Sequence, residues 1–250
     1  MESIFLPSKM FLTPGVQENE SILTIEPLHH GYGTSVGNAL RRVLLSSLPG
    51  SAVTAMKIRG VQHEFAGLTG VKEDILDIGL NLKLLRLKVH SDEPVVLTLK
   101  AKGNGVITAG DIEKNADVEI VNPDLVIATL TSKTAVLDME ITVEKGRGYS
   151  TTETRNEHKQ EIGLIYLDAL FSPVKTVGLK VENTRVGEVT NYDKLIMNII
   201  TDGTITAQEA TEQATKIILN HFSWIQGQLQ HASLTEQIAR SSEDHKSAGE

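Results

Sequence analysis

The 250-residue sequence contains no cysteine, which removes several chemistries at once. Disulfides, thiolate zinc sites, iron–sulfur clusters and a cysteine nucleophile all need that residue. Aromatic residues make up only 4% of the chain, so a stacking platform for single-stranded nucleic acid is not expected. No apolar run approaches the roughly 20 residues that cross a bilayer. The sequence therefore argues against a thiol-dependent or membrane-spanning role.

What remains is the composition of an ordinary globular protein. Hydrophobic residues make up 40% of the chain, and its length allows one large domain or two small ones. The chain contains 24 basic and 32 acidic residues, which gives a net charge of −8. This balance argues against a broad surface for nucleic-acid phosphates, because such a surface needs clustered Lys and Arg. The absence of disulfides fits a reducing cytoplasm.

Hydrophobic periodicity predicts long helices near both ends of the chain. The first is expected over 34–48, after Thr34 as N-cap and before Pro49-Gly50. The last begins at the capping box Thr206-Ala207-Gln208-Glu209 and is expected to end near His231. A polar, disordered tail is expected over 233–250.

The middle of the chain is expected to be rich in β-structure, with one short helix over 73–84 and a polar loop over 150–161. The clearest alternation of apolar and polar residues runs from Ala135 to Val143. Strands 85–89 and 95–101 are expected to form a hairpin. The other expected strands cover 3–12, 21–28, 52–58, 61–65, 117–121, 125–130, 174–181 and 194–201.

Common catalytic and nucleotide-binding motifs are absent, with one partial exception. The eight histidines are scattered, and adjacent His29-His30 would point opposite ways on an extended segment, so no metal site is expected. Gly33-Thr34-Ser35-Val36-Gly37 matches the Gly-x-Ser-x-Gly elbow of serine hydrolases. That elbow places its serine at the end of a strand, whereas Ser35 falls in the first turn of the expected helix. A serine hydrolase is kept as an alternative of low weight.

The first helix carries two distinct faces at 100° per residue. Its apolar face is a core stripe, formed by Val36, Leu40, Val43, Leu44 and Leu48. Three residues point away from that stripe, namely Asn38, Arg42 and Leu45. An Arg beside an exposed Leu is typical of an interface. A solvated helix face is the other interpretation, since single exposed leucines are common.

The last helix has more apolar surface than one sheet face needs. One row contains Ala210, Ala214, Ile217, His221 and Trp224, and a second contains Ile218, Phe222, Ile225 and Leu229. Either the helix is deeply buried in its own domain, or it packs against both the sheet and another chain.

Several blocks of the sequence resemble the N-terminal region of the bacterial RNA polymerase α subunit. The most specific block runs from Gly37 to Gly50 and contains Asn38-Ala39-Leu40-Arg41-Arg42. The similarity extends in order from about residue 20 to about residue 230. Further matching blocks are Glu26-Pro27-Leu28, Gly31-Tyr32-Gly33, His63-Glu64, Glu73-Asp74-Ile75-Leu76, Asn81-Leu82-Lys83, Val118-Glu119-Ile120-Val121, Gly146-Arg147-Gly148-Tyr149, Ser172-Pro173-Val174 and Asp202-Gly203-Thr204-Ile205.

The resemblance implies an α+β fold in two interlocked parts. A dimerisation subdomain, with an antiparallel sheet and two long helices, would contain 1–49 plus 173–232. A β-rich subdomain would be inserted at 50–172. The family usually continues through a flexible linker into a small helical DNA-binding module, and the tail from residue 233 resembles that linker.

The resemblance also implies a function, that of a non-catalytic subunit of DNA-directed RNA polymerase. Such a chain would homodimerise and scaffold the β and β′ subunits in the cytoplasm, at the nucleoid. It would bind no cofactor or metal, because Mg²⁺ belongs to the catalytic subunits, and would meet DNA only through the assembled enzyme. Neither a membrane nor a small-molecule substrate is expected. A freestanding small-ligand binding module, using the β surface, stays as a further alternative.

Site residues carry over from the family by position. Arg42 and Leu45 fall at positions tied to β binding, and Asn38 lies beside them on the helix. Lys83, Asp168 and Val174 fall at positions linked to β′ binding. Dimerisation would use the first and last long helices, through Val36, Leu40, Ile217, Ile218, Phe222, Ile225 and Leu229.

Overall fold

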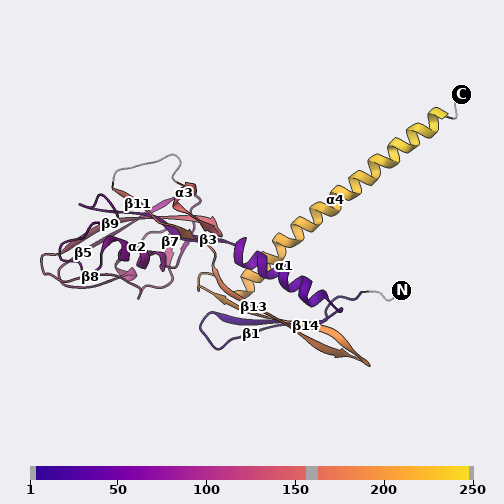
Figure 1. Ribbon diagram of the computed structural model, residues 1–250, viewed down its shortest axis with the longest axis horizontal. Coiled ribbons are helices and arrows are strands. Elements are labelled where there is room, and N and C mark those ends of the chain that lie inside the picture. The colour runs from indigo at the N-terminus through magenta and orange to yellow at the C-terminus, as the bar shows by residue number, and fades with distance from the viewer. Residues whose placement is uncertain (1–3, 156–162, 248–250) are drawn as a thin grey trace.

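The computed structural model describes the backbone of residues 4–155 and 163–247, and side chains within those ranges up to residue 230. It confirms an α+β fold with antiparallel sheets. Figure 1 shows two parts side by side, with the last helix projecting away from both. The first part combines the two ends of the chain, and the second is built from the segment between them.

A four-stranded antiparallel sheet joins the two ends of the chain, in the order β1-β2-β14-β13. β1 (Lys9–Pro14) and β2 (Glu20–Leu28) come from the N-terminal side, and β13 (Val174–Val186) and β14 (Val189–Thr201) from the C-terminal side. Leu23 of β2 lies opposite Met197 of β14, and both side chains are buried. The sheet therefore cannot form until residues more than 150 positions apart have met.

Helix α1 (Tyr32–Ser46) lies against β13 and β14 of this sheet. It approaches closely because its inward face carries two glycines, Gly33 and Gly37. A Cβ built on Gly37 would lie 2.5 Å from Leu179 Cδ1 and 2.8 Å from Leu195 Cδ1. The glycines of the apparent hydrolase motif thus serve helix–sheet packing.

The second part contains four strands in the order β11-β3-β9-β5, covered by a short helix and by small two-stranded sheets. Strand β9 (Val136–Arg147) pairs with β3 (Pro49–Ile58) on one side and β5 (Val95–Lys102) on the other. Its side chains alternate between buried and exposed, as the sequence predicts. The remaining elements are α2 (Ile75–Lys83), β4 (Leu87–Val89), β6 (Gly105–Thr108), the 3-10 turn η1 (Ala109–Asp111), β7 (Val118–Ile120), β8 (Val126–Leu130), β10 (Tyr149–Ser150), α3 (Thr152–Arg155), β11 (Leu164–Tyr166) and β12 (Ala169–Leu170).

Buried apolar side chains form two main clusters. One draws on residues from Val53 to Ile165, and the other combines residues from Leu23 to Leu48 with residues from Val174 to Ala214. Separate cores of this kind are what two subdomains, one inserted into the other, require.

The last helix, α4 (Ala207–Ser247), begins where the sequence predicts and ends later. The capping box forms as expected: Glu209 N–H donates to Thr206 Oγ1 at 3.2 Å, and Thr206 N–H donates to Glu209 Oε2 at 3.0 Å. The predictions of a helix end near His231 and of a disordered tail from residue 233 are wrong, because the helix continues to Ser247. No Gly or Pro follows Gly227 before Gly249, so the sequence offers no helix breaker there. Residues 248–250 lie outside the described ranges.

Four further expectations differ from the structure. Strands 85–89 and 95–101 do not form a hairpin, because β4 pairs with β7 and β5 pairs with β9. The segment 61–65 is not a strand. Helix α1 begins at Tyr32 after Gly31 rather than after Thr34, because Gly31 takes a left-handed conformation, φ 83°, that favours glycine. The expected 150–161 loop also differs, because Ser150 ends β10 and residues 152–155 form the one-turn helix α3. Residues 156–161 of that segment lie outside the described ranges.

The close packing of α1 leads to a stability prediction. We expect Gly37→Val to lower the free energy of unfolding by at least about 2 kcal/mol, because the new side chain overlaps Leu179 and Leu195. Urea unfolding followed by circular dichroism measures the change.

Ser35→Val provides the matched control, because Ser35 is exposed on the same helix and the substitution introduces the same β-branched residue. It should cost only a few tenths of a kcal/mol (roughly the helix-propensity difference). An equal loss of unfolding free energy in the two variants would show that the close helix–sheet contact does not restrict the size of the side chain at position 37.

Candidate functional site

The outer face of α1 is polar and unpaired. Asn38, Arg41 and Arg42 are exposed, while Leu40 and Leu44 are buried on the opposite side. Neither arginine forms an ion pair or a side-chain hydrogen bond with any residue in the described ranges. Two unpaired guanidinium groups on a rigid helix can bind carboxylates or backbone carbonyls of another chain.

Leu45 does not belong to this exposed face, contrary to the helical-wheel prediction. It is partly buried against the cluster that contains Ala210 and Ala214 of α4. The wheel describes an isolated helix and takes no account of α4, which packs against α1 in the structure. Arg42 and Asn38 are therefore the accessible members of the predicted set.

Two of the residues predicted for dimerisation are already used within a single chain. Leu40 is buried and Val36 is partly buried, both in the core between α1 and the sheet. Leu40 is therefore used within the single chain, and its place at a dimer contact stays a prediction. Sequence periodicity identified the apolar stripe correctly but could not say which surface covers it.

Helix α4 divides into a packed beginning and an uncovered remainder. Ala207, Ala210 and Ala214 are buried, and Ile217 and Ile218 pack partly against the same cluster. Beyond them the large apolar side chains are exposed: Leu219, Phe222, Trp224, Ile225 and Leu229. Of the two interpretations that the sequence left open, deep burial within its own domain is excluded for residues 219–229. Leu219 belongs to this set and was missed, because it lies outside both rows on the wheel.

A second polar site lies on the inserted part, where Lys83 at the end of α2 faces Asp168. Lys83 Nζ lies 3.7 Å from Asp168 Oδ2, and both side chains are about one-third exposed. Asp168 Oδ1 also accepts a hydrogen bond from the Thr152 N–H at 2.9 Å. The family resemblance placed these two residues in one functional set, and the structure brings them together.

Tyr149 completes this network by donating its hydroxyl to Asp168. The Thr152 N–H, the Tyr149 hydroxyl and the Lys83 charge hold the pKa of Asp168 below its usual value, and this outweighs partial desolvation. The same hydrogen bond raises the pKa of Tyr149, because ionised tyrosine could no longer donate to the carboxylate. Asp168 is therefore an ionised anchor between α2, α3 and β10.

An apolar stripe beside Lys83 was not identified from the sequence. Leu76, Leu80 and Leu84 recur every fourth residue along α2 and are all exposed. A pocket of about 180 Å³ is lined by Leu76 and Leu80 of this stripe together with Lys83 and Asp168, and also by Met56, Ile165 and Leu167. The four-residue spacing was available in the sequence, but the neighbouring buried positions Ile75 and Ile78 dominate the periodic signal.

Val174 does not join Lys83 and Asp168. It is buried at the start of β13, in the core of the other part of the chain. The alternation of β13 points this side chain toward the core, so Val174 cannot contribute to a docking surface directly.

The structure also removes the serine-hydrolase alternative. Ser35 is exposed in the first turn of α1, and its hydroxyl donates to the carbonyl of Gly31 at 3.3 Å. No nucleophile elbow forms there, because the motif lies within a helix. Within the described ranges, no three His, Asp or Glu side chains lie together as metal ligands would. None of the helices there is long and apolar enough to cross a membrane.

Comparisons with known proteins point in one direction. A family model described as the RNA polymerase Rpb3/RpoA insert domain matches residues 56–172. The DNA-directed RNA polymerase subunit alpha of Alkaliphilus oremlandii is 50% identical over 223 residues, covering 89% of this chain and 70% of that relative. The same subunit of Moorella thermoacetica is 53% identical over 86% of this chain and 66% of its own length. That of Oceanobacillus iheyensis is 47% identical over 94% and 75%.

The lowered pKa of Asp168 predicts how the network responds to pH. A carboxyl whose pKa is lower in the folded state stabilises that state above its unfolded pKa of about 4, and this contribution is lost as the pH falls through the folded value. We expect Asp168→Asn to lower the free energy of unfolding by about 1 kcal/mol at pH 7. The difference from the unsubstituted chain should shrink below about pH 4.

Urea unfolding of both proteins at pH 7 and pH 3 measures this difference. Asp124→Asn is the control, because Asp124 is exposed and its side chain makes no ion pair or hydrogen bond within the described ranges. A stability difference that stays constant between the two pH values would contradict the role given to the Asp168 charge.

Proposed function

Because this chain belongs to the family of DNA-directed RNA polymerase α subunits, we propose that it is the non-catalytic subunit on which the polymerase is assembled. Two copies associate, and the dimer then binds the β and β′ subunits. The observation that carries this proposal is the row of exposed large side chains on α4 formed by Phe222, Ile225 and Leu229, with Leu219 and Trp224 exposed to either side of it. A monomeric protein rarely exposes so many apolar residues side by side.

A second copy of the chain is the partner that fits this row. Association of two identical chains about a two-fold axis uses the same patch on both, so one apolar row supplies both halves of the contact. α4 projects away from the body of the chain, which leaves Phe222, Ile225 and Leu229 free to contact another molecule (Figure 1). The core side chains Val36 and Leu40 contribute indirectly, by packing α1 into the core that the start of α4 also joins.

The β subunit is the proposed partner of the outer face of α1. Arg42 presents a planar, permanently charged donor group that no carboxylate of the described chain neutralises. Asn38 lies one turn before it and adds an amide that can both donate and accept. Leu45 acts indirectly, by packing α1 against the core.

The β′ subunit is the proposed partner of the Lys83–Asp168 site. The apolar stripe formed by Leu76, Leu80 and Leu84 borders the ion pair and supplies apolar contact area, which the pair lacks. An exposed ion pair contributes little affinity alone, so the leucines would provide most of the binding free energy and the pair would set the orientation.

Catalysis belongs, in this proposal, to the large subunits. Nucleotidyl transfer by polymerases uses clustered aspartates that hold two Mg²⁺ ions, and the sequence contains no Asp-x-Asp motif. The chain therefore acts through protein contacts, binds no cofactor of its own, and meets DNA through the assembled enzyme.

Charges placed on the exposed part of α4 test dimerisation. We expect the pair Ile225→Asp and Leu229→Asp to convert the protein from a dimer to a species of 27.2 kDa, because desolvating a carboxylate opposes burial of that face. Size-exclusion chromatography with light scattering gives the mass. Both residues lie outside the core of the single chain, so folding should survive.

The control pair is Val96→Asp with Val106→Asp, two similarly exposed apolar positions on the inserted part. These substitutions should leave the mass at twice 27.2 kDa. An unchanged mass for the α4 pair would remove α4 from the dimer contact.

Truncation of Arg42 tests docking of the β subunit. We expect Arg42→Ala to weaken binding of purified β by about 2 kcal/mol, the range of an interface hot spot, with no change in unfolding free energy. Isothermal titration calorimetry of the dimer with β measures the affinity. Arg59→Ala is the control, because Arg59 is also exposed but lies on the inserted part and already pairs with Asp138 at 3.6 Å. Wild-type affinity of Arg42→Ala for β would refute this assignment.

A further inference from the structure

An exposed aromatic–aliphatic pair lies where the two parts of the chain meet. Tyr149 of β10 and Leu170 of β12 are directly opposite each other in an antiparallel pair, so both side chains project from the same face. Tyr149 is 59% exposed and Leu170 is 50% exposed. Both sequence neighbours of Leu170, Ala169 and Phe171, are buried.

The backbone beneath this pair is closely packed around two glycines. Gly50 of β3 lies opposite Gly146 of β9, and Phe171 fills the space that two side chains would occupy. A Cβ on Gly146 would lie 2.6 Å from the Phe171 ring, and a Cβ on Gly50 would overlap the Phe171 carbonyl. Because Phe171 points inward, its neighbour Leu170 must point outward. The exposure of Leu170 is therefore fixed by packing.

Tyr149 is also held in place. Its hydroxyl donates to Asp168, and the adjacent Gly148 carbonyl accepts a hydrogen bond from the Phe171 N–H at 2.8 Å. With the hydroxyl engaged, the ring is the part of the side chain that a partner can contact. A side chain fixed before binding loses little conformational entropy on binding.

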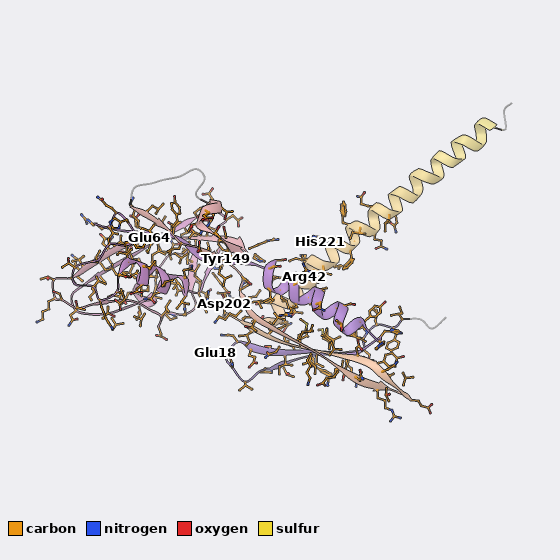
Figure 2. The ribbon with its side chains drawn as sticks, in the orientation of Figure 1. Glu18, Arg42, Glu64, Tyr149, Asp202 and His221 are labelled. Carbon is orange, nitrogen blue, oxygen red and sulfur yellow. The ribbon has the colours of Figure 1, made fainter. Side chains whose placement is uncertain are left out.

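This pair is continuous with the outer face of α1. A Cβ built on Gly148 would lie 3.2 Å from the carbonyl oxygen of Ser46, the last residue of α1. Ser46 lies one turn beyond Arg42 and donates its hydroxyl to the Arg42 carbonyl at 2.7 Å. Figure 2 labels Arg42 and Tyr149 on the two sides of this junction.

Three unpaired arginines belong to the segments that meet at this junction. Arg147 is exposed next to Gly148, and with Arg41 and Arg42 it makes three arginines without an acidic partner in the described ranges. Asp168, the carboxylate that binds Tyr149, is occupied by Lys83 and Thr152. In a chain of net charge −8, these arginines give the segments that border the pair an excess of unpaired positive charge. Its complement is a segment with carboxylates flanking an apolar side chain.

We infer that Tyr149 and Leu170 form an apolar anchor which, together with Arg42 and Arg147, makes one docking surface across both parts of the chain. The occupant is an acidic segment of the same large subunit that binds Arg42, with an apolar residue seated on the Tyr149–Leu170 pair. This inference rests on the proposed function, since it extends the surface assigned to the β subunit. It also gives the junction a role: the partner can bind tightly only when both parts hold this relative orientation.

The test compares four variants of the full-length dimer for binding to purified β subunit by isothermal titration calorimetry. Leu170→Asp and Tyr149→Ala probe the anchor, and Arg42→Ala probes the helix. Val136→Asp is the matched control, because Val136 is 49% exposed and lies at the opposite end of β9 from Arg147. That end is about 35 Å away at the rise of a β-strand. Circular dichroism and thermal unfolding confirm that each variant is folded.

We expect Leu170→Asp and Tyr149→Ala each to raise the Kd for β at least about tenfold, with Val136→Asp unchanged. If Arg42→Ala weakens binding and the two anchor variants do not, the proposed function stands and this inference is overturned. If no variant, Arg42→Ala included, changes the Kd, the β-docking assignment itself fails. If the two anchor variants weaken binding but Arg42→Ala does not, the anchor and α1 do not form a single surface and this inference is overturned. The same holds if Val136→Asp weakens binding as much as the anchor variants do.

Discussion

A hydrogen bond between Asp193 and the first turn of α1 connects the two ends of this chain. The Asp193 carboxylate, only 4% exposed, accepts the Gly33 N–H at 2.9 Å, and the two residues are 160 positions apart in sequence. No side chain of the local segment caps α1, so this carboxylate from β14 does so from a distance. A buried carboxylate is costly unless it is bonded, and the positive end of a helix is a favourable place for it. The orientation of α1 on the sheet depends on this contact and on the glycines that let the helix come close.

The docking surfaces follow from that orientation. With Gly33 and Gly37 held against β13 and β14, the helix must turn Asn38 and Arg42 outward. At its far end α1 meets the inserted part at Gly148, where a second glycine contact, Gly50 with Gly146 around Phe171, fixes the ends of β3 and β9. Two close backbone approaches thus hold the parts together, and the polar network Lys83–Asp168–Tyr149 begins directly beside the second. These close contacts fix the backbone that bears the side chains proposed to bind partners, and so fix the direction in which those side chains point.

Helix α4 shows how one element can serve both a fold and an assembly. Its first turns bury alanines in the core of the chain, where small side chains allow the helix to lie close to α1 and the sheet. The following turns carry Phe222, Trp224, Ile225 and Leu229, which are too large and too many for a helix face left in water. The change from Ala to large apolar residues along one helix marks where packing within the chain ends. The first turns of α4 therefore stabilise the single chain, and the following turns are the part proposed to bind a second chain.

The sequence by itself determined the two long helices, the capping box at Thr206, the alternation of β9 and the outward position of Arg42. Each of these depends on residues within a few positions of one another, where 3.6-residue and two-residue periods act directly. Only the tertiary structure decided that Leu45 packs inward, that Leu40 and Val174 are covered within one chain, and that β4 and β5 pair with β7 and β9 instead of with each other. It also decided that Lys83, Asp168 and Tyr149 meet, and that Leu170 is exposed. Hydrophobic periodicity shows which side of a helix or strand is apolar. The residues that cover that side are distant in sequence, and the local sequence does not identify them.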